Sequence, residues 1–237
     1  MLAQYRGEVE LPEDWIDVWA DAVTVRREGA AAIGADLVGF VVQDKLTVMR
    51  SAFPEDLPDG ARPPAALLAA RDDLGLLYPV EALRSVPGGA FLRADTHLRY
   101  EGTLALARQL CGAVGVDLPA HLDTEPAQRR LISGDLGSRF DPAIVEVQAI
   151  PGDLGIAELV ESNHPEISAV GGHVGTRQVL RSASAPDPRT VVVFGDSYAF
   201  CAPYFSGLAW FLAQVFREVH FLWAPFGWDP GYLDEVR

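Results

Sequence analysis

The pattern of apolar and polar positions predicts helices and buried strands that alternate through the first third of the chain. Residues 10–28 place apolar side chains three and four positions apart, which predicts a helix packed on a sheet. Apolar residues 35–42 predict a buried strand, residues 65–74 a short helix, and residues 75–80 a second strand. Helix and strand in repeated alternation indicate a parallel sheet with helices on both faces.

The middle of the chain departs from this alternation. Residues 100–114 predict a strong helix and residues 126–132 a short one. Residues 144–150 alternate between apolar and polar positions, which predicts a half-exposed strand, and residues 171–181 predict another. We expect an antiparallel insertion beside the main sheet, within about residues 134–182, close enough to form one wall of a site.

The carboxyl-terminal part contains a strand, a turn and a helix in close succession. Three valines and a phenylalanine at residues 191–194 predict a short strand buried on both faces. Gly195 and Asp196 interrupt the run, Ser197 follows at once, and residues 203–216 predict a helix. Such a turn exposes a serine hydroxyl at the edge of a sheet, where the N–H groups of the helix stabilise an oxyanion. An ordinary turn with an N-capping serine has the same pattern.

Composition and charge exclude several classes of partner. The chain has 237 residues, enough for one large α/β domain, and we expect a single domain over residues 1–237. Its formal net charge is −14, which argues against binding to nucleic acid or to anionic membrane surfaces. Cys111 and Cys201 lie in apolar stretches and are expected to be free buried thiols. We find no metal-ligand cluster and no phosphate-binding glycine motif, so no metal and no cofactor are predicted.

The sequence gives one indication of cellular location. Residues 1–10 lack the basic segment and apolar core of a signal peptide, and no stretch reaches the roughly 18 apolar residues of a spanning helix. As it stands, the sequence predicts a soluble cytoplasmic protein. A periplasmic or extracellular location would require a leader that has been removed.

A serine hydroxyl needs a base to act as a nucleophile at neutral pH, usually an imidazole held by a carboxylate. The chain has five histidines, and His97 lies two residues after Asp95. In an extended loop these side chains project to the same side, so Asp95 can orient the ring while its other nitrogen faces Ser197. The same residues are also typical of a polar turn before a helix, with Asp95 as a cap and His97 exposed.

These motifs together resemble a known family. The Phe-Gly-Asp-Ser-Tyr sequence at residues 194–198 resembles the serine block of SGNH-type hydrolases. The Asp-Thr-His sequence at residues 95–97 lies upstream of it and is followed by Gly102 and an alanine-rich helix. This order resembles the SGNH-hydrolase-like domain of the alginate O-acetyltransferase family, in which the aspartate and histidine precede the serine. Residues 41–48 and 133–137 are similar to further segments of that family.

The resemblance implies an α/β fold: a three-layer sandwich with a mainly parallel sheet, SGNH-hydrolase-like (flavodoxin-like), with a rearranged motif order and a small β insertion. It implies O-acetylation of a sugar or polysaccharide in exopolysaccharide biosynthesis, with an acyl donor and a membrane protein that passes acyl groups as partners. The sequence departs from the family where Leu98 replaces an aromatic residue and Gln43 replaces a proline. The first change weakens any transfer of substrate by analogy.

We assign catalytic roles from these motifs. Ser197 is the nucleophile, His97 the base and Asp95 the residue that fixes the ring. The backbone N–H of Ser197 is the expected oxyanion donor, and a second donor is not assigned. Asp196 is expected to be structural, because turn carboxylates usually accept from nearby backbone amides.

Aromatic residues near the serine are candidates for substrate binding. Residues 218–223 predict a strand, and the loop after it lies at the carboxyl edge of the sheet, where ligands of open sheets bind. Tyr198, Trp223, Phe226 and Trp228 are the candidates, and the three in or beside the loop are equally compatible with capping the sheet.

Two alternatives to acyl transfer remain open. A carbohydrate or small-ester esterase (a deacetylase) would use the same three residues with water as acceptor. A non-catalytic glycan-binding assembly subunit would retain the fold without the reaction. The sequence does not separate a transferase from an esterase, because the difference lies in how well the acceptor site excludes water.

Overall fold

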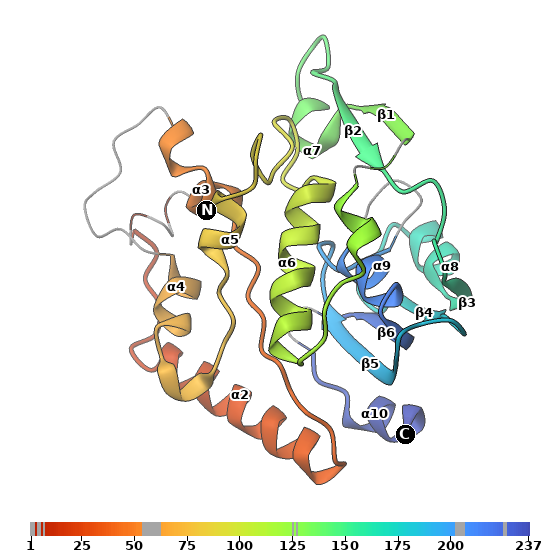
Figure 1. Ribbon diagram of the computed structural model, residues 1–237. Coiled ribbons are helices and arrows are strands. Elements are labelled where there is room, and N and C mark those ends of the chain that lie inside the picture. Colours follow the sequence, from red (N-terminus) through yellow and green to blue (C-terminus); the bar gives the residue numbers. More distant parts are fainter. Residues whose placement is uncertain are drawn as a thin grey trace. The chain divides into compact units, whose positions relative to one another are not determined.

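The computed structural model describes residues 3, 6, 8–53, 63–124, 126, 128–201, 207–224 and 227–237, which form a mixed α/β structure (Figure 1). The chain separates into two units. One contains Met1–Arg84 and Pro230–Arg237, and the other contains Ser85–Asp229. The expected α/β class is confirmed in its general form.

The first unit is mainly helical. Its long helix α2 packs Ala20 and Val23 against Leu68 and Leu74, and Trp15 and neighbouring apolar side chains lie against this cluster. The predicted helix at residues 10–28 is therefore present, shifted toward the carboxyl end. The elements of this unit are α2 (Trp15–Ala32), α3 (Lys45–Val48), η1 (Arg50–Ala52), α4 (Pro64–Ala69), η2 (Asp72–Leu74), α5 (Val80–Arg84) and α10 (Pro230–Val236).

The two strands predicted in this unit are reduced to a single parallel bridge between Phe40 and Leu77. The Val41 N–H donates to the Leu77 carbonyl at 2.9 Å, and no longer ladder forms among the described residues. Helices begin almost at once on both sides: Asp44 caps α3 by accepting from the Thr47 N–H at 2.9 Å, and α5 starts at Val80. The helices limit pairing on the carboxyl side of the bridge, and the apolar residues before it form no described strand.

The second unit contains a four-stranded sheet with the order β3-β4-β6-β5. Its strands are β3 (Glu158–Ser162), β4 (Arg177–Arg181), β5 (Asp187–Gly195) and β6 (Phe216–Trp223). The predicted strands at residues 191–194 and 218–223 are confirmed as parts of β5 and β6, which pair in parallel. The expected burial of residues 191–194 on both faces is wrong, because β5 lies at the edge of the described sheet and these residues are half-buried. The β4–β6 and β3–β4 pairs are antiparallel. The described strands therefore do not form the mainly parallel sheet that we expected.

The reason lies in the predicted insertion. It was expected beside the main sheet, but β4 pairs directly with β6 and carries β3 at the edge. The sequence did not predict β3, whose first four residues are exposed and lack an alternation of apolar and polar positions. A short helix, α8 (His164–Ala169), connects the two strands. The predicted insertion thus supplies two of the four described strands of this sheet, β3 and β4.

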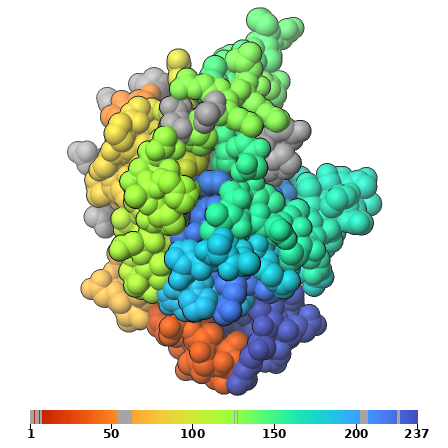
Figure 2. Space-filling view, turned by 45° about the vertical axis from the view of Figure 1, so that its right-hand side comes forward, coloured from red at the N-terminus to blue at the C-terminus, as the bar shows by residue number. Residues whose placement is uncertain are grey.

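A separate antiparallel pair joins β1 (Gln128–Ile132) and β2 (Glu146–Ile150). The predicted strand at residues 144–150 is confirmed, whereas the predicted helix at residues 126–132 is wrong. Every residue of β1 pairs with one of β2, and this pairing overrides the helical preference of the Gln, Arg and Leu residues in the segment. The green segment that contains β1 lies at the molecular surface (Figure 2), where four of the five β1 residues are exposed.

The core of the second unit lies between the sheet and two helices, α6 (Tyr100–Ala113) and α9 (Leu208–Ala213). The Tyr100 ring lies 5.0 Å from the Phe211 ring, and Phe211 and Phe221 are fully buried. The helix predicted at residues 100–114 is confirmed. Of the helix predicted at residues 203–216, residues 208–213 form α9, and residues 203–206 lie outside the described residues. A 3-10 helix, η3 (Ala120–Asp123), follows α6.

Cys111 and Cys201 are both free and buried, as predicted. Burial raises the pKa of the Cys111 thiol to about 11 and that of Cys201 to about 12. Among the helices described, none combines the length and the apolar character needed to cross a bilayer.

Candidate active site

The segment from Phe91 to Leu98 forms a tight loop directly before α6. An antiparallel bridge joins Phe91 to Leu98, and the Arg99 N–H donates to the Ala90 carbonyl at 2.8 Å. The Leu92 N–H donates to the His97 carbonyl at 3.3 Å, which closes the loop. These bonds fix the backbone that carries the Asp-Thr-His sequence.

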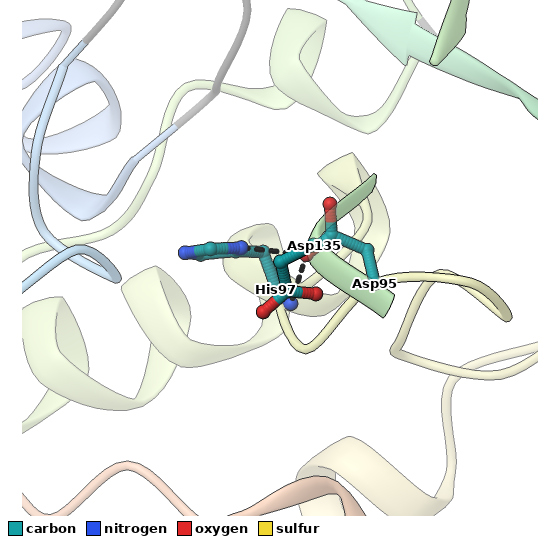
Figure 3. Close-up of side chains that lie close together, drawn as sticks. All are labelled: Asp95, His97 and Asp135. Atoms are coloured by element: carbon teal, nitrogen blue, oxygen red, sulfur yellow. Dashed lines mark hydrogen bonds and ion pairs between the residues drawn. The ribbon is translucent and has the colours of Figure 1, made fainter. Parts of the chain in front are cut away.

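Within this loop Asp95 and His97 form a hydrogen-bonded pair (Figure 3). The Asp95 Oδ1 lies 2.6 Å from the His97 Nδ1 and also accepts from the His97 N–H at 2.9 Å. Asp95 is 2% exposed, whereas the His97 side chain is 23% exposed. A carboxylate in this position favours the tautomer with its proton on Nδ1, which leaves Nε2 as the basic atom.

The environment of the pair shifts both pKa values. The hydrogen bond to Asp95 raises the pKa of His97 above its ordinary value against the opposing effect of burial, and the charges of Asp95, Asp135 and Asp196 raise it further. Burial opposes the ionisation of Asp95, but hydrogen bonds from the ring and backbone of His97 outweigh it, so the pKa of Asp95 is lowered. An ionised aspartate thus stabilises the imidazolium form of His97.

Asp135, from α7 (Gly134–Gly137), holds the residue between Asp95 and His97. Its Oδ1 accepts from the Thr96 N–H at 2.7 Å, and its Oδ2 accepts from the Thr96 hydroxyl. Residues 133–137 resemble a segment of the family named above, but the resemblance predicted no role for Asp135. The available signal was the Gly-Asp pair itself, which predicts a turn with an exposed carboxylate.

A second acid supports the loop from β2. The Glu146 carboxylate accepts from the Arg93 N–H at 2.8 Å and from the Ala94 N–H at 2.7 Å. The Ala94 carbonyl in turn accepts from the Leu136 and Gly137 N–H groups at 3.2 and 2.8 Å. The loop is therefore held by hydrogen bonds to α7 and β2, although no sequence pattern pairs Glu146 with it.

The serine motif follows the end of β5. Gly195 pairs with Trp223, the last residue of β6, so Ser197 lies just beyond the carboxyl ends of the two parallel strands. The Asp196 Oδ1 accepts from the Tyr198 N–H at 3.0 Å, and the Asp196 carbonyl accepts from the Ala199 N–H at 3.1 Å. Asp196 therefore shapes the turn, which is the structural part predicted for it.

The two motifs meet through Tyr198. Its hydroxyl donates to the Thr96 carbonyl at 3.0 Å, and its ring centroid lies 5.9 Å from that of His97. Ser197 directly precedes Tyr198 and so lies close to the Asp-Thr-His loop. Within the described part of the chain, no hydrogen bond joins the Ser197 hydroxyl to His97, so the complete triad stays a prediction. In unliganded enzymes such bonds are often long and tighten only when substrate binds.

The aromatic candidates for substrate binding have other contacts. Trp223 stacks on His173 with centroids 5.0 Å apart, and the Trp228 ring lies 5.6 Å from that of Phe194. The hydroxyl of Tyr198 is used on Thr96, while Phe226 lies outside the described residues. Contact of these four residues with a substrate stays a prediction. His173 belongs to the predicted insertion, which therefore contacts Trp223 at the carboxyl end of β6.

The donor atoms of Asp95, His97 and Asp135 lie within 4.8 Å of one another, a spacing that can hold a metal ion. Hydrogen bonds already engage the His97 Nδ1 and both oxygens of Asp135. The hydrogen bonds alone therefore explain why the three side chains lie together, as expected for a predicted base with supporting carboxylates.

Solved structures with the same general fold were found. A DHHW family protein from Eubacterium siraeum has a TM-score of 0.58 at 14% identity, over 92% of this chain and 80% of that one. PatB1 of Bacillus cereus with a sulfonyl adduct has a TM-score of 0.58 at 11% identity, over 95% of this chain and 85% of that one. At these identities the likeness shows the fold alone.

The O-acetyltransferase domain of AlgJ from Pseudomonas putida matches at a TM-score of 0.46 and 18% identity, over 87% of this chain and 72% of that one. No family model matches the sequence, and no curated protein matches it.

Proposed function

We propose that the protein transfers an acyl group through Ser197, most specifically an acetyl group to a sugar or polysaccharide hydroxyl. The observation that carries the proposal is the 2.6 Å hydrogen bond between buried Asp95 and partly exposed His97, in a loop that Tyr198 joins to the serine turn. The motif order supports the acetyl group and the sugar, because it resembles that of the alginate O-acetyltransferase family. The fold of the solved structures described above is compatible with it.

The first half of the reaction forms an acyl-serine. The Ser197 Oγ attacks the carbonyl carbon of the acyl donor while the His97 Nε2 takes the hydroxyl proton. The Ser197 N–H donates to the resulting oxyanion. The tetrahedral intermediate then collapses, the bond to the leaving group breaks, and His97 returns the proton to that group. Asp95 stabilises the imidazolium throughout.

The second half releases the acyl group to an acceptor hydroxyl. His97 takes the proton of the acceptor as its oxygen attacks the acyl-serine carbonyl. Collapse breaks the bond to Ser197 Oγ, which recovers its proton from His97. With a sugar as acceptor the product is an O-acetyl sugar, whereas with water it is a free acid. Transferase and esterase thus share every residue and differ in the acceptor.

The test measures acyl turnover with an activated acetyl ester, with and without an acetyl-accepting polysaccharide, followed by analysis of both products. We expect acetylated polysaccharide in wild type and a loss of at least about a thousandfold in Ser197→Ala. Ser184→Ala, an exposed serine on the connector before β5, is the matched control and should keep wild-type turnover.

Labelling with a serine-directed phosphonate separates the remaining alternative. We expect one adduct, on Ser197, that is absent from Ser197→Ala. Glycan binding without labelling or turnover in wild type would favour the non-catalytic subunit. Release of free acetate alone, with the polysaccharide unmodified, would favour the esterase.

A further inference from the structure

Thr96, which separates the two predicted catalytic residues of the loop, has each of its polar groups engaged. Its N–H donates to Asp135 Oδ1 at 2.7 Å, its hydroxyl donates to Asp135 Oδ2, and its carbonyl accepts from the Tyr198 hydroxyl at 3.0 Å. Both oxygens of one carboxylate therefore hold the residue whose neighbours are Asp95 and His97. A loop fixed at this point holds the imidazole in one position.

The approach of α7 to the loop is close enough to exclude any side chain at residue 134. Gly134 has φ of +58°, in the left-handed region. A Cβ there would lie 2.3 Å from the Ala94 carbonyl oxygen and 2.7 Å from the Asp95 Cβ. The backbone that carries Asp135 is thus packed directly against the loop. Its short side chain then places the carboxylate within hydrogen-bond distance of Thr96.

We propose that Asp135 is a positioning residue, which fixes the Asp95–His97 loop through Thr96 and places a further negative charge beside the imidazole. Its catalytic meaning rests on the function proposed above. A donor atom of Asp135 lies within 4.8 Å of a ring nitrogen of His97. The carboxylates that act on the ring come from three places: Asp95 on the same loop, Asp135 on α7 and Asp196 after β5.

This charge has a consequence for proton transfer. The imidazolium that forms when His97 takes the serine proton is stabilised by each nearby carboxylate, and Asp135 is one of those that raise the pKa of His97. Asp135→Asn removes the charge while its side-chain oxygen can still accept from the Thr96 N–H. The pKa of His97 should therefore fall in this variant. Asp135→Ala removes both the charge and the acceptors.

The direct test is an NMR titration of the His97 ring in wild type, Asp135→Asn and Glu158→Gln. Glu158 is exposed on β3, and its replacement makes the same change in net charge away from His97. We expect a lower pKa of His97 in Asp135→Asn and an unchanged one in Glu158→Gln. An unchanged titration in folded Asp135→Asn, or an equal shift in both variants, overturns the proposal.

The kinetic test uses the pH dependence of acyl turnover. In Asp135→Asn the acidic limb of the profile should move to lower pH, together with the NMR titration. In Asp135→Ala the maximal kcat should fall by about 100-fold with KM little changed, because a displaced base costs that much. Wild-type kcat in a folded Asp135→Ala contradicts the positioning role.

A second pair of variants applies if replacements of Asp135 do not fold. Thr96→Val removes the hydroxyl that donates to Asp135 and keeps the shape, whereas Thr96→Ser retains the hydroxyl. We expect kcat to fall at least about tenfold in Thr96→Val and to recover in Thr96→Ser. Equal kcat in the two variants overturns the proposal.

The outcomes for Asp135 and for acyl transfer are distinguishable. The NMR titration needs no substrate, so it decides whether the Asp135 charge acts on His97 even if no acyl turnover is found. The converse result is acyl turnover that depends on Ser197 while the pKa of His97 is the same in wild type and Asp135→Asn. That combination supports the proposed function and refutes the role of Asp135.

Discussion

The imidazole of His97 lies near three carboxylates, and its Nδ1–H donates to the one that is almost fully buried. Asp95, 2% exposed, can neither turn to solvent nor reach another base without breaking the two hydrogen bonds to His97. In this setting the protonated ring is favoured. The ring must nevertheless be neutral to take a proton from serine, and this conflict determines the pH dependence of the proposed reaction.

The first prediction concerns that dependence. Because the hydrogen bond to Asp95 raises the pKa of His97 above its ordinary value of 6.5, His97 stays protonated to a higher pH than a free imidazole does. We expect kcat/KM to fall as the pH drops through the raised pKa, with the midpoint above 6.5. The measurement is kcat/KM across a pH series at constant ionic strength. A midpoint at or below that of free imidazole would contradict it.

The second prediction concerns the tautomer of His97. Asp95→Asn keeps the size of the side chain but removes the charge that favours a proton on Nδ1. Turnover should fall about 10,000-fold, as expected when the base is held in the wrong tautomer. Asp117→Asn, an exposed aspartate after α6, is the matched control and should leave turnover unchanged. Residual turnover within tenfold of wild type would show that Asp95 is not the orienting residue.

Helix α7 has only four residues, yet it holds the Asp-Thr-His loop in place. Its four residues include two glycines that lie against the Asp-Thr-His loop, and its carboxylate holds Thr96. A third prediction follows from Gly134. Gly134→Ala should destabilise the second unit by about 2 kcal/mol or more, because alanine is strained at positive φ and its Cβ meets the Ala94 carbonyl.

Denaturant unfolding of Gly134→Ala measures the effect. The matched control is Gly112→Ala in α6, where a Cβ meets nothing within 4 Å. That replacement should stabilise the protein by about 0.5–1 kcal/mol, as alanine does in exposed helix positions. Equal stabilities of the two variants would refute the close approach of α7 to the loop.

Local pattern predicted the elements whose packing is decided within a few residues. The run of valines in β5, the alternation in β2 and the apolar face of α6 are legible because each pattern lies within one segment, although the β5 valines are only half-buried and β2 buries Gln148 rather than Val147. The direct pairing of Asp95 with His97 is legible for the same reason, since the two residues are neighbours. Such features depend on little beyond the segment itself.

The features that the sequence did not predict depend on distant partners. β3 and β1 are polar, exposed strands that exist because β4 and β2 pair with them. Asp135 and Glu146 hold loop residues that lie about 40 to 50 positions before them in the chain. By sequence alone, both acids look like ordinary surface residues. The antiparallel character of the sheet likewise depends on where β4 pairs, which no local pattern specifies.

At the scale of the whole molecule, the reactivity of the two buried cysteines is a measure of folding. Both lie in the second unit and carry pKa values of about 11 and about 12, so thiolate is scarce at neutral pH. We predict that neither reacts with a disulfide reagent in the native state and that both react once denaturant unfolds the unit. Reaction of either thiol without denaturant would show that this core opens locally. Cys→Ser variants assign the signals.

The bond from the Tyr198 phenol to the Thr96 carbonyl spans 102 positions of the chain. It joins the two ends of that segment directly, so the two predicted catalytic motifs share one contact that involves none of the residues between them. Evolution can therefore lengthen, shorten or rearrange the intervening excursion, so long as the parts of it that brace the histidine loop are kept. A tyrosine directly after the serine thus keeps the two predicted catalytic motifs adjacent whatever the length of the chain between them.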